Sequence, residues 1–451
     1  MRPAILDWLD RPSASTALID ATTGRTWTYT ELAADVRGRA ATLANGRESL
    51  VACLCQPDAE SAIGYLAALA AGHAVMMLDG SADPQIIDQQ LKRYQPEYLL
   101  DGDSSERLAG STEPLHDDLA VLLGTSGSTG SPKFVRLSVA NIDANAAQII
   151  EILGIDSGER AVQSLPLHYS YGLSILNSHL LARATIVFTR SSLVRPDFWQ
   201  VMRRHECTSF AGVPYAYTIL DRIGFERVDL PALTTLTQAG GRMAPETVLR
   251  FARVMTDRGG RLVVMYGQTE ATARIAYLPP DRVLNKRDRI GIPVPHGRLS
   301  LAEDGELIYE GPNVMLGYAQ TRADLAHGDV LRGRLATGDM ARMDDEGFFA
   351  IVGRKRRMAK LCGQRVNLDE LESLLAAHGR VATLELAEKL VIVHAPGDGT
   401  ASASDLAQIV RERIRIPTRF IRVQEIDRIP RTSSGKTDYV HLKDELSIDD
   451  E

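Results

Sequence analysis

The run Leu50-Val-Ala-Cys-Leu-Cys55 is apolar throughout and predicts a buried strand. Asp58 follows it as a candidate N-cap. Beyond Asp58, small and apolar residues recur at helical spacing until Gly72, a typical helix terminator. A second apolar run, Ala74-Val-Met-Met-Leu78, comes next. A strand, a helix and a strand in this order predict a layered α/β architecture.

The same alternation extends outward along much of the chain. Ser138 begins a further helical pattern. Short apolar or β-branched runs, separated by helical patterns, recur at 97–100, 120–123, 184–188 and 261–266. We therefore predict the α/β fold class for this part of the chain.

The sequence pattern changes after Gly291. Runs at 306–310 and 347–352 predict strands among glycine-rich turns, with little helix between them. After these strands, helices and strands alternate again over roughly a hundred residues, the size of a small domain. We predict a large N-terminal domain of layered α/β subdomains plus a β-rich subdomain over residues 1–353, and a small, mobile α+β C-terminal domain over residues 354–451.

Three details of the C-terminal part can be predicted. The basic run Arg354-Lys-Arg-Arg357 reads as a solvated charged face rather than a nucleic-acid site. The acidic end, residues 444–451, is expected to be a frayed tail. The expected elements are a helix from Asn367, strands near 381–385 and 390–394, a helix at 405–414 and a strand at 420–424.

The composition is that of an ordinary globular protein. Hydrophobic residues make up 44% and charged residues 24% of the 451 residues, which argues against a disordered, collagen-like or coiled-coil chain. The net charge of -7 has the wrong sign for a protein that coats nucleic acid. No apolar run is long enough to span a membrane, and the four cysteines show no zinc-ligand spacing. Reduced core thiols and the lack of an export signal favour a cytoplasmic location.

The segment from Leu122 to Lys133 is the first candidate for chemistry. It combines three glycines, five hydroxyls and a lysine after an apolar strand. Backbone N–H groups freed by glycine, hydroxyl donors and an ammonium suit the oxygens of a polyphosphate. The segment is not a Walker A loop, because its glycine and lysine spacing differs and an apolar run follows it. The alternative is a flexible Ser/Gly loop.

Two acids and a second lysine are further candidates. Glu270 ends the segment Tyr266-Gly-Gln-Thr-Glu270, and a carboxylate at the carboxyl end of a strand suits Mg²⁺. Asp339, in Thr337-Gly-Asp339, suits the two hydroxyls of a ribose. Lys436 lies in a Ser/Thr/Gly turn. Taken alone, each has a plainer interpretation as a solvated turn residue or a surface lysine.

Together, these segments resemble the core motifs of the adenylate-forming superfamily, which comprises acyl-CoA synthetases, carrier-domain adenylation enzymes and luciferases. The resemblance extends essentially from end to end, and six motifs in the family's order carry it. The motifs are Thr125-Ser-Gly-Ser-Thr-Gly-Ser-Pro-Lys133, Tyr266-Gly-Gln-Thr-Glu270, Gly305-Glu-Leu-Ile-Tyr-Glu-Gly-Pro-Asn313, Thr337-Gly-Asp339, Gly353-Arg354 with Gly363-Gln-Arg365, and Pro430-Arg-Thr-Ser-Ser-Gly-Lys436.

The resemblance implies a reaction and a set of roles. Members join a carboxylic acid to ATP with Mg²⁺, release pyrophosphate, form an acyl-adenylate and mostly pass the acyl group to a thiol. By matching, Lys436 would stabilise the transition state, Thr269 would reach the α-phosphate and Glu270 would hold Mg²⁺. The implied nucleotide-binding residues are Thr125, Ser126, Gly127, Ser128, Thr129, Gly130, Lys133, Gly240, Gly241, Tyr266, Gly267, Asp339 and Arg354.

More specific roles follow for some of these residues. Ser128, Thr129 and Lys133 would hold the β- and γ-phosphates. Tyr266 would stack on the adenine. Asp339 with Arg354 would bind the ribose. All of these roles are implied by the resemblance.

Family members also rotate the small domain between two poses, one for adenylation and one for thiol transfer. By matching, Arg356 stands at the hinge and Gly363 faces a tunnel for the thiol. The acceptor would be coenzyme A or the phosphopantetheine of a separate acyl or peptidyl carrier protein. A carrier would be separate because no carrier motif follows Lys436.

The acid pocket is inferred from the segment between Leu165 and Leu173. Tyr169 stands where many members place a gating histidine, and the neighbouring His168 is either a second candidate or a packing histidine. No aspartate lies between 165 and 176 to hold an α-ammonium, and the pocket walls are small or neutral, which fits an uncharged fatty, aryl or other acyl chain. The implied acid-binding residues are His168, Tyr169, Ala211, Gly212 and Gly241.

Three alternatives to an acid–thiol ligase stay open at this point. The first is a nucleotide-binding sensor or scaffold that has lost ligase chemistry. The second is an amino-acid adenylating enzyme, and the third is a luciferase-like oxygenase.

Overall fold

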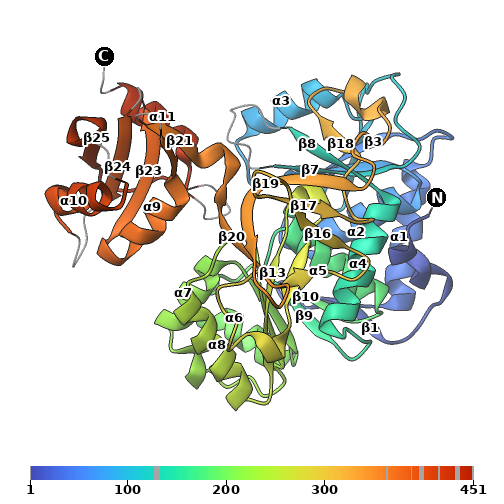
Figure 1. Cartoon of the computed structure of the whole chain (residues 1–451). Coiled ribbons are helices and arrows are strands. Elements are labelled where there is room, and N and C mark those ends of the chain that lie inside the picture. Colours follow the sequence, from blue (N-terminus) through green and yellow to red (C-terminus); the bar gives the residue numbers. More distant parts are fainter. Residues whose placement is uncertain are drawn as a thin grey trace. The chain divides into compact units, whose positions relative to one another are not determined.

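The protein is described by a computed structural model, which consists of two compact units (Figure 1). Unit 1 contains residues 2–125, 133–299 and 309–335, and unit 2 contains residues 300–308 and described residues between 336 and 448. Unit 2 thus has residues on both sides of the predicted boundary at 353/354, which stays a prediction of where the mobile part begins. The described residues are 2–125, 133–361, 364–386, 389–395, 401–414, 417–431 and 437–448.

Two sheets with parallel centres and antiparallel edges organise unit 1. The strand order of one is β18 (Gly317–Ala319), β8 (Phe134–Ser138), β7 (Leu119–Gly124), β4 (Ala74–Asp79), β3 (Leu50–Cys55), β5 (Tyr98–Asp101) and β6 (Ser104–Arg107). The order of the other is β15 (Ile292–Pro293), β14 (Ala276–Leu278), β13 (Arg261–Tyr266), β12 (Thr235–Gln238), β11 (Ser209–Gly212), β9 (Arg160–Gln163), β10 (Thr185–Phe188), β1 (Thr16–Asp20) and β2 (Arg25–Thr28).

Helices cover both faces of these sheets. One continuous core joins the sheets through α1 (Tyr29–Leu43), α2 (Ala59–Ala70), α4 (Val139–Leu153) and α5 (Ser170–Leu181), and the short helix η1 (Ala4–Asp10) packs into it. On the other face of the β7 sheet, α3 (Pro84–Tyr94) buries Tyr94 against Phe134, with ring centroids 5.1 Å apart. The β12 sheet is covered outside by α6 (Pro196–Arg204), α7 (Pro214–Arg222) and α8 (Pro245–Asp257). This layered arrangement confirms the predicted α/β fold class.

Local signals placed the first elements correctly. Helix α2 begins where predicted because the Asp58 side chain accepts a hydrogen bond from the Ser61 backbone N–H at 3.0 Å. Gly72 follows the helix with a φ of +78°, a conformation that favours glycine. Helix α4 begins with a reciprocal capping box between Ser138 and Asn141. Among the described residues, no helix combines the length and the apolar character needed to cross a membrane.

The cysteines of β3 are buried, as the apolar run predicts. The contact of the Cys55 thiol with Cys53, followed by burial, raises the pKa of Cys55 well above its ordinary value. A thiol held in the protonated form is a poor nucleophile, so Cys55 is a packing residue.

The β-rich part predicted after Gly291 is also present. Most residues of its sheet belong to unit 2, and its strand order is β16 (Arg298–Leu301), β17 (Glu306–Glu310), β19 (Arg334–Met343) and β20 (Phe349–Arg354). Unit 2 continues with the hairpin of β21 (Met358–Leu361) and β22 (Gln364–Asn367), and with the sheet of β23 (Arg380–Leu386), β24 (Lys389–Ala395) and β25 (Ile421–Glu425).

Helices pack on both faces of the β23–β24–β25 sheet (Figure 1). α9 (Leu368–Leu375) and α10 (Ala403–Ile414) pack against the face of β24 that carries Ile392. α11 (Tyr439–Ile448) packs against the opposite face, where Leu442 and Leu446 are buried with Val391. The expectation of a frayed tail from residue 444 is therefore wrong as far as Ile448. The two leucines, four residues apart, supply a buried helical stripe.

A buried ion pair ties separate parts of unit 1 together. Nη2 of Arg322 lies 2.9 Å from Oε1 of Glu97, and their side chains are 5% and 6% exposed. The other oxygen of Glu97 accepts a hydrogen bond from the Leu50 N–H at 2.8 Å. Nη2 of Arg322 also donates to the Glu113 carbonyl at 3.0 Å. The pair thus joins the start of β3 to the segment that follows β18.

Replacing Arg322 with leucine is expected to lower the free energy of unfolding by about 3–5 kcal/mol, because Glu97 would keep a buried charge with only the exposed Arg47, 3.9 Å away, as a cationic neighbour. Urea unfolding followed by circular dichroism measures this change. Arg195, which pairs with Asp197 at 3.4 Å on the surface, supplies the control. Arg195→Leu is expected to change the same free energy by less than about 1 kcal/mol. Equal losses in the two variants would contradict a stabilising role for the buried pair.

Candidate active site

Several described site residues of unit 1 lie at the edge of the sheet where β13 ends. β11, β12 and β13 are parallel neighbours, so their carboxyl ends meet at one edge of the sheet. That edge is where ligands bind in open α/β sheets. It carries three of the predicted segments, namely Ala211 with Gly212, Gly240 with Gly241, and the run from Tyr266 to Glu270.

Glu270 and Lys133 both contact Tyr318. Glu270 is half-buried in the turn η3 (Thr269–Ala271), and its Oε1 accepts a hydrogen bond from Tyr318 Oη at 2.7 Å. Nζ of Lys133 lies 3.3 Å from the centroid of the same ring, a cation–π contact. The predicted metal ligand and a predicted phosphate-binding residue therefore share one aromatic neighbour. Sequence reasoning missed Tyr318, because no motif marks it.

The residues at this position fit Mg²⁺. In nucleotide sites Mg²⁺ is held through one or two carboxylates, and phosphate oxygens complete its shell. Glu270 supplies one such carboxylate at the edge of the sheet. Within the described part of the chain, no group of three or more His, Cys, Asp or Glu could hold a metal by itself. The donor set suits an ion that is shared with a bound nucleotide.

A buried amide holds the turn that carries Glu270. The Asn313 side chain donates from Nδ2 to the carbonyls of Ala271 and Arg274, both at 2.8 Å. Its Oδ1 accepts a hydrogen bond from Tyr309 Oη at 2.6 Å. The sequence marks Asn313 only as the last residue of a family motif. The structure shows that it fixes the path of the chain at the end of the turn and three residues beyond it.

The backbone of the same segment is conformationally restricted at two residues. Thr272 has a φ of +63°, which is uncommon for a β-branched residue, and its hydroxyl donates to the Asn313 carbonyl at 2.8 Å. A Cβ on Gly267 would lie 1.8 Å from the Ala273 carbonyl oxygen, so only glycine fits there. The hydroxyl of Thr269 lies 3.3 Å from that of Ser170, which orients it at the edge of the sheet.

Tyr169 faces the loop that carries Gly240. Tyr169 precedes α5, and burial raises the pKa of its hydroxyl, which therefore stays protonated at neutral pH. A Cβ on Gly240 would lie 2.4 Å from Tyr169 Oη and 3.1 Å from Val213, and Gly240 has a φ of +81°. Two predicted site residues are thus in close approach, and glycine permits it.

His168 lies beside an acid of the other sheet. Its Nε2 is 3.8 Å from Oδ2 of Asp79. Burial lowers the pKa of His168, although the nearby Asp79 charge opposes that shift. Its Nδ1 is buried and has no hydrogen-bond partner among the described residues. His168 therefore stays a predicted acid-binding residue, with a packing histidine as the alternative.

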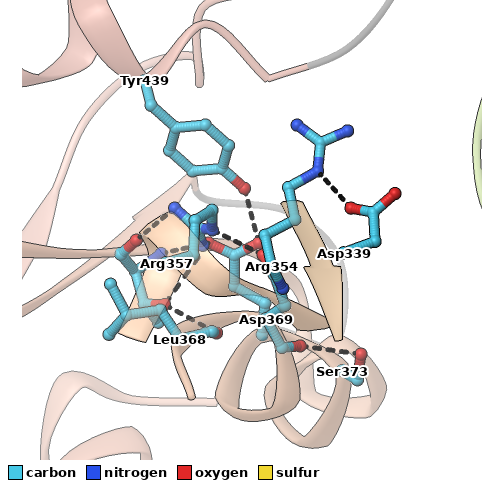
Figure 2. Close-up of polar contacts among 9 residues, drawn as sticks. Asp339, Arg354, Arg357, Leu368, Asp369, Ser373 and Tyr439 are labelled. Carbon is cyan, nitrogen blue, oxygen red and sulfur yellow. Dashed lines mark hydrogen bonds and ion pairs between the residues drawn. The ribbon is translucent and has the colours of Figure 1, made fainter. Parts of the chain in front are cut away.

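Unit 2 brings the two predicted ribose-binding residues together (Figure 2). Asp339 of β19 and Arg354 of β20 are opposite each other in the antiparallel register, and Arg354 Nε lies 3.3 Å from Asp339 Oδ1. The Asp339 side chain is 8% exposed, whereas that of Arg354 is 57% exposed. The Asp339 N–H donates to the hydroxyl of Thr337 at 3.1 Å. The carboxylate is therefore held in place, while the guanidinium faces solvent.

Arg357 is a structural residue, which corrects the prediction of a solvated basic face. Its side chain is 13% exposed and pairs with Asp369 of α9 (Figure 2). It also pairs with Glu372 of the same helix. Its guanidinium stacks on Tyr439, with Cζ 3.9 Å from the ring centroid. Tyr439 Oη donates to Glu372 at 2.6 Å. Tyr439 is the first residue of α11, so this cluster anchors the start of α11 to α9.

The structure describes only the two ends of the predicted phosphate loop. Thr125 and Lys133 are at the two ends of the predicted phosphate loop, and the Thr125 N–H donates to the Lys133 carbonyl at 3.3 Å. The side chain of Arg356 is outside the described part of the structure. Also outside the described residues are Ser126, Gly127, Ser128, Thr129, Gly130, Gly363 and Lys436.

The chain matches the AMP-binding enzyme family over residues 7–113 and 101–319. A 2-succinylbenzoate–CoA ligase of Bacillus subtilis strain 168 is 27% identical over 83% of this chain and 78% of the relative. An L-proline–[L-prolyl-carrier protein] ligase of Pseudomonas fluorescens is 29% identical over 71% of this chain and 68% of the relative. An isonitrile lipopeptide synthase of Streptomyces coeruleorubidus is 30% identical over 92% of this chain, which spans only 31% of that protein's length.

A solved structure has the same fold. The O-succinylbenzoate coenzyme A synthetase of Bacillus subtilis, in complex with ATP and a magnesium ion, matches with a TM-score of 0.79. The match covers 99% of both chains at 23% sequence identity. It confirms the predicted combination of a large α/β part with a smaller C-terminal part.

The approach of Gly240 to Tyr169 can be tested by adding one methyl group. Gly240→Ala is expected to lower the free energy of unfolding by about 2–4 kcal/mol, through backbone strain and overpacking against Tyr169. Gly24 supplies the control, because it has a φ of +76° and open space where a Cβ would be added. Gly24→Ala therefore measures the backbone strain without the overpacking. Gly24→Ala should cost only about 1–2 kcal/mol. Both values come from urea unfolding, and an equal loss in the two variants would show that Tyr169 does not restrict Gly240.

Proposed function

Because the chain belongs to the AMP-binding enzyme family, we propose that it is an AMP-forming ligase that activates a carboxylic acid with ATP and passes the acyl group to a thiol. Pyrophosphate leaves in the first half-reaction, and AMP leaves in the second. The observation that carries the proposal is the grouping of Thr269, Glu270 and Lys133 at the carboxyl end of β13. That edge of an α/β sheet is the usual ligand-binding edge.

The first half-reaction brings two anions together. A carboxylate oxygen must attack the α-phosphorus while the bond to pyrophosphate breaks, so positive charge is needed where the transition-state charge spreads. Lys133 supplies a cation for the β- and γ-phosphates, and the Tyr318 ring steadies it. We assign Lys436 to the transition state. When bound at Glu270, Mg²⁺ neutralises phosphate charge.

The remaining nucleotide contacts follow from the same residues. Thr269 presents its hydroxyl beside Ser170, and we assign it to the α-phosphate. Asp339 is held by Thr337 and Arg354, and we assign its carboxylate to the ribose hydroxyls. Tyr266, at the end of β13, is assigned to the adenine, because an aromatic face stacks on a base.

The acceptor is the thiol of coenzyme A or of a carrier-protein phosphopantetheine. Similar proteins include a CoA ligase and a carrier-protein ligase, and both acceptors present the same thiol arm. An acyl or peptidyl carrier is the partner in the second case. The cytoplasm, where CoA and ATP are available, is the proposed location.

Adenylation can be tested by ATP–pyrophosphate exchange across a panel of carboxylic acids. Lys436→Ala is expected to lower the exchange rate by about 10²–10³, because it removes one preorganised cation from the transition state. Lys389, an exposed lysine of β24 in the same unit, provides the control. Lys389→Ala should leave the rate unchanged. Tight ATP binding without exchange for any acid would overturn the ligase proposal and favour a nucleotide sensor.

The second half-reaction has its own test. Gly363→Leu is expected to leave pyrophosphate exchange unchanged and to lower thioester formation by at least about tenfold, because the added side chain would obstruct the thiol path in only one of the two poses. Thioester formation is followed by mass spectrometry with coenzyme A and with a phosphopantetheinylated carrier protein. Gly38, exposed in α1 with no atom within 4 Å of an added Cβ, supplies the control Gly38→Leu. A parallel loss of both half-reactions would contradict this assignment of Gly363.

A further inference from the structure

Arg274 is a buried cation that no predicted role uses. It follows the turn η3, and its side chain belongs to the interior of unit 1, with the residue 3% exposed. Its contacts among the described residues are Met265 Sδ, 3.4 Å from Nε, and the Tyr171 ring, whose centroid is 3.9 Å from Cζ. Neither neighbour carries a negative charge.

No acid of the described part of the chain compensates this charge. Burial lowers the pKa of Arg274, and the groups that oppose the shift are Tyr171 and Tyr169 rather than a carboxylate. Buried charges in proteins are normally paired and hydrogen-bonded. A guanidinium has five N–H donors, and the sulfur of Met265 is a weak acceptor for one of them. The remaining donors suit an anion that arrives with a ligand.

A small cavity lies beside the Arg274 side chain. Its volume is about 30 Å³, which is room for about two or three water-sized atoms and matches the head of a carboxylate. Ala211 and Thr237 line it from the ends of β11 and β12, and Tyr171 lines it from α5. Ala211 is also one of the predicted acid-binding residues. The cavity therefore adjoins the pocket proposed for the acid.

The other polar groups of the cavity are already satisfied or uncharged. The Tyr171 hydroxyl bonds with that of Thr237 at 2.8 Å. Burial lowers the pKa of His179 to about 4, so this histidine is neutral at pH 7. Glu159 lies at the amino-terminal end of β9, and its carboxylate accepts a hydrogen bond from Thr208. Arg274 lies near the opposite end of the sheet, because the Ile275 N–H bonds to the carbonyl of Tyr266, the last residue of β13.

We infer that Arg274 is an anion-binding residue of the acid pocket, and that the acid activated by this protein carries a second carboxylate at a distance from the one that reacts. The inference rests on the proposed function and narrows its substrate class. From the sequence we expected a substrate with an uncharged acyl chain, because the pocket segments that led to this expectation do not include Arg274. The inference replaces that expectation with a diacid. The same buried cation disfavours an α-ammonium, and with it the amino-acid alternative.

Matched pairs of acids test the inference on the wild-type protein. Pyrophosphate exchange is measured with malonate and propanoate, succinate and butanoate, adipate and hexanoate, and phthalate and benzoate. In at least one pair, kcat/KM for the diacid should exceed that of the monoacid by about tenfold or more. A hydrogen bond to a charged group outweighs the free energy of about 1.4 kcal/mol that corresponds to a factor of ten. A preference for the monoacid in every pair would overturn the inference, and this comparison needs no variant.

Variants then connect the preference to Arg274. Arg274→Met should lower kcat/KM for the preferred diacid by about 10- to 100-fold, mainly through KM, while the matched monoacid is little changed. Arg274→Lys keeps the charge but cannot donate two parallel hydrogen bonds. Its kcat/KM for the diacid should lie between that of wild type and that of Arg274→Met. Arg253, exposed on α8, supplies the control Arg253→Met, which should behave as wild type. An unchanged diacid preference in folded Arg274→Met would also overturn the inference.

Calorimetric titration with the same diacids separates this inference from the proposed function. A diacid that binds wild type and not Arg274→Met, without exchange, would uphold the anion site and reject the ligase reaction. Exchange with monoacids alone would uphold the ligase reaction and reject the anion site. The absence of both exchange and diacid binding would reject both.

Discussion

The site depends on the segment from Glu270 to Arg274, and a buried amide from a distant part of the chain bonds to this segment at two points. Asn313 bonds to the carbonyls of Ala271 and Arg274, which precede it by 42 and 39 residues. A hydrogen bond of this kind contributes about 0.5–1.5 kcal/mol to stability. An aspartate of the same shape has no donors when ionised, so it could not replace the asparagine. The Arg274 carbonyl also accepts a hydrogen bond from Asn145 Nδ2 at 3.3 Å, and the Ala271 carbonyl accepts one from the Ala273 N–H at 2.6 Å. Asn313 is the one side chain that bonds to both carbonyls, so it links the chain next to Glu270 to the chain at Arg274.

The parts of the fold that the sequence predicted are those whose causes lie within a few residues. Helix α2 is defined by the Asp58 cap and by an apolar period that ends at Gly72, and both are visible in the sequence. Features set by distant partners were not predictable. Tyr318 reaches Glu270 across 48 residues, and Arg322 reaches Glu97 across 225. Helix α11 was missed because its two leucines acquire partners only when β24 has formed beside them.

The candidate site also combines features that the sequence predicted with features that only the fold shows. Motifs located Glu270, Asp339 and Lys133, because the family resemblance assigns roles by order along the chain. The charge of the acid pocket was not predictable, because it depends on burial and on the absence of a neighbouring acid. An arginine in a sequence with 24% charged residues is most simply assigned to the surface. Only the folded chain shows that Arg274 is enclosed between Tyr171 and Met265.

Binding a second carboxylate at Arg274 would also leave the reacting carboxylate free to attack the α-phosphorus. The reacting carboxylate must remain nucleophilic, and a cation that held it tightly in the ground state would slow its attack. A distal anion can provide binding and orientation without touching the reacting oxygen. The Tyr171 ring covers one face of the guanidinium, so the in-plane N–H groups remain the directions for a carboxylate. Arginine meets both demands at once, because it can stack on a ring and donate two parallel hydrogen bonds, which lysine cannot do.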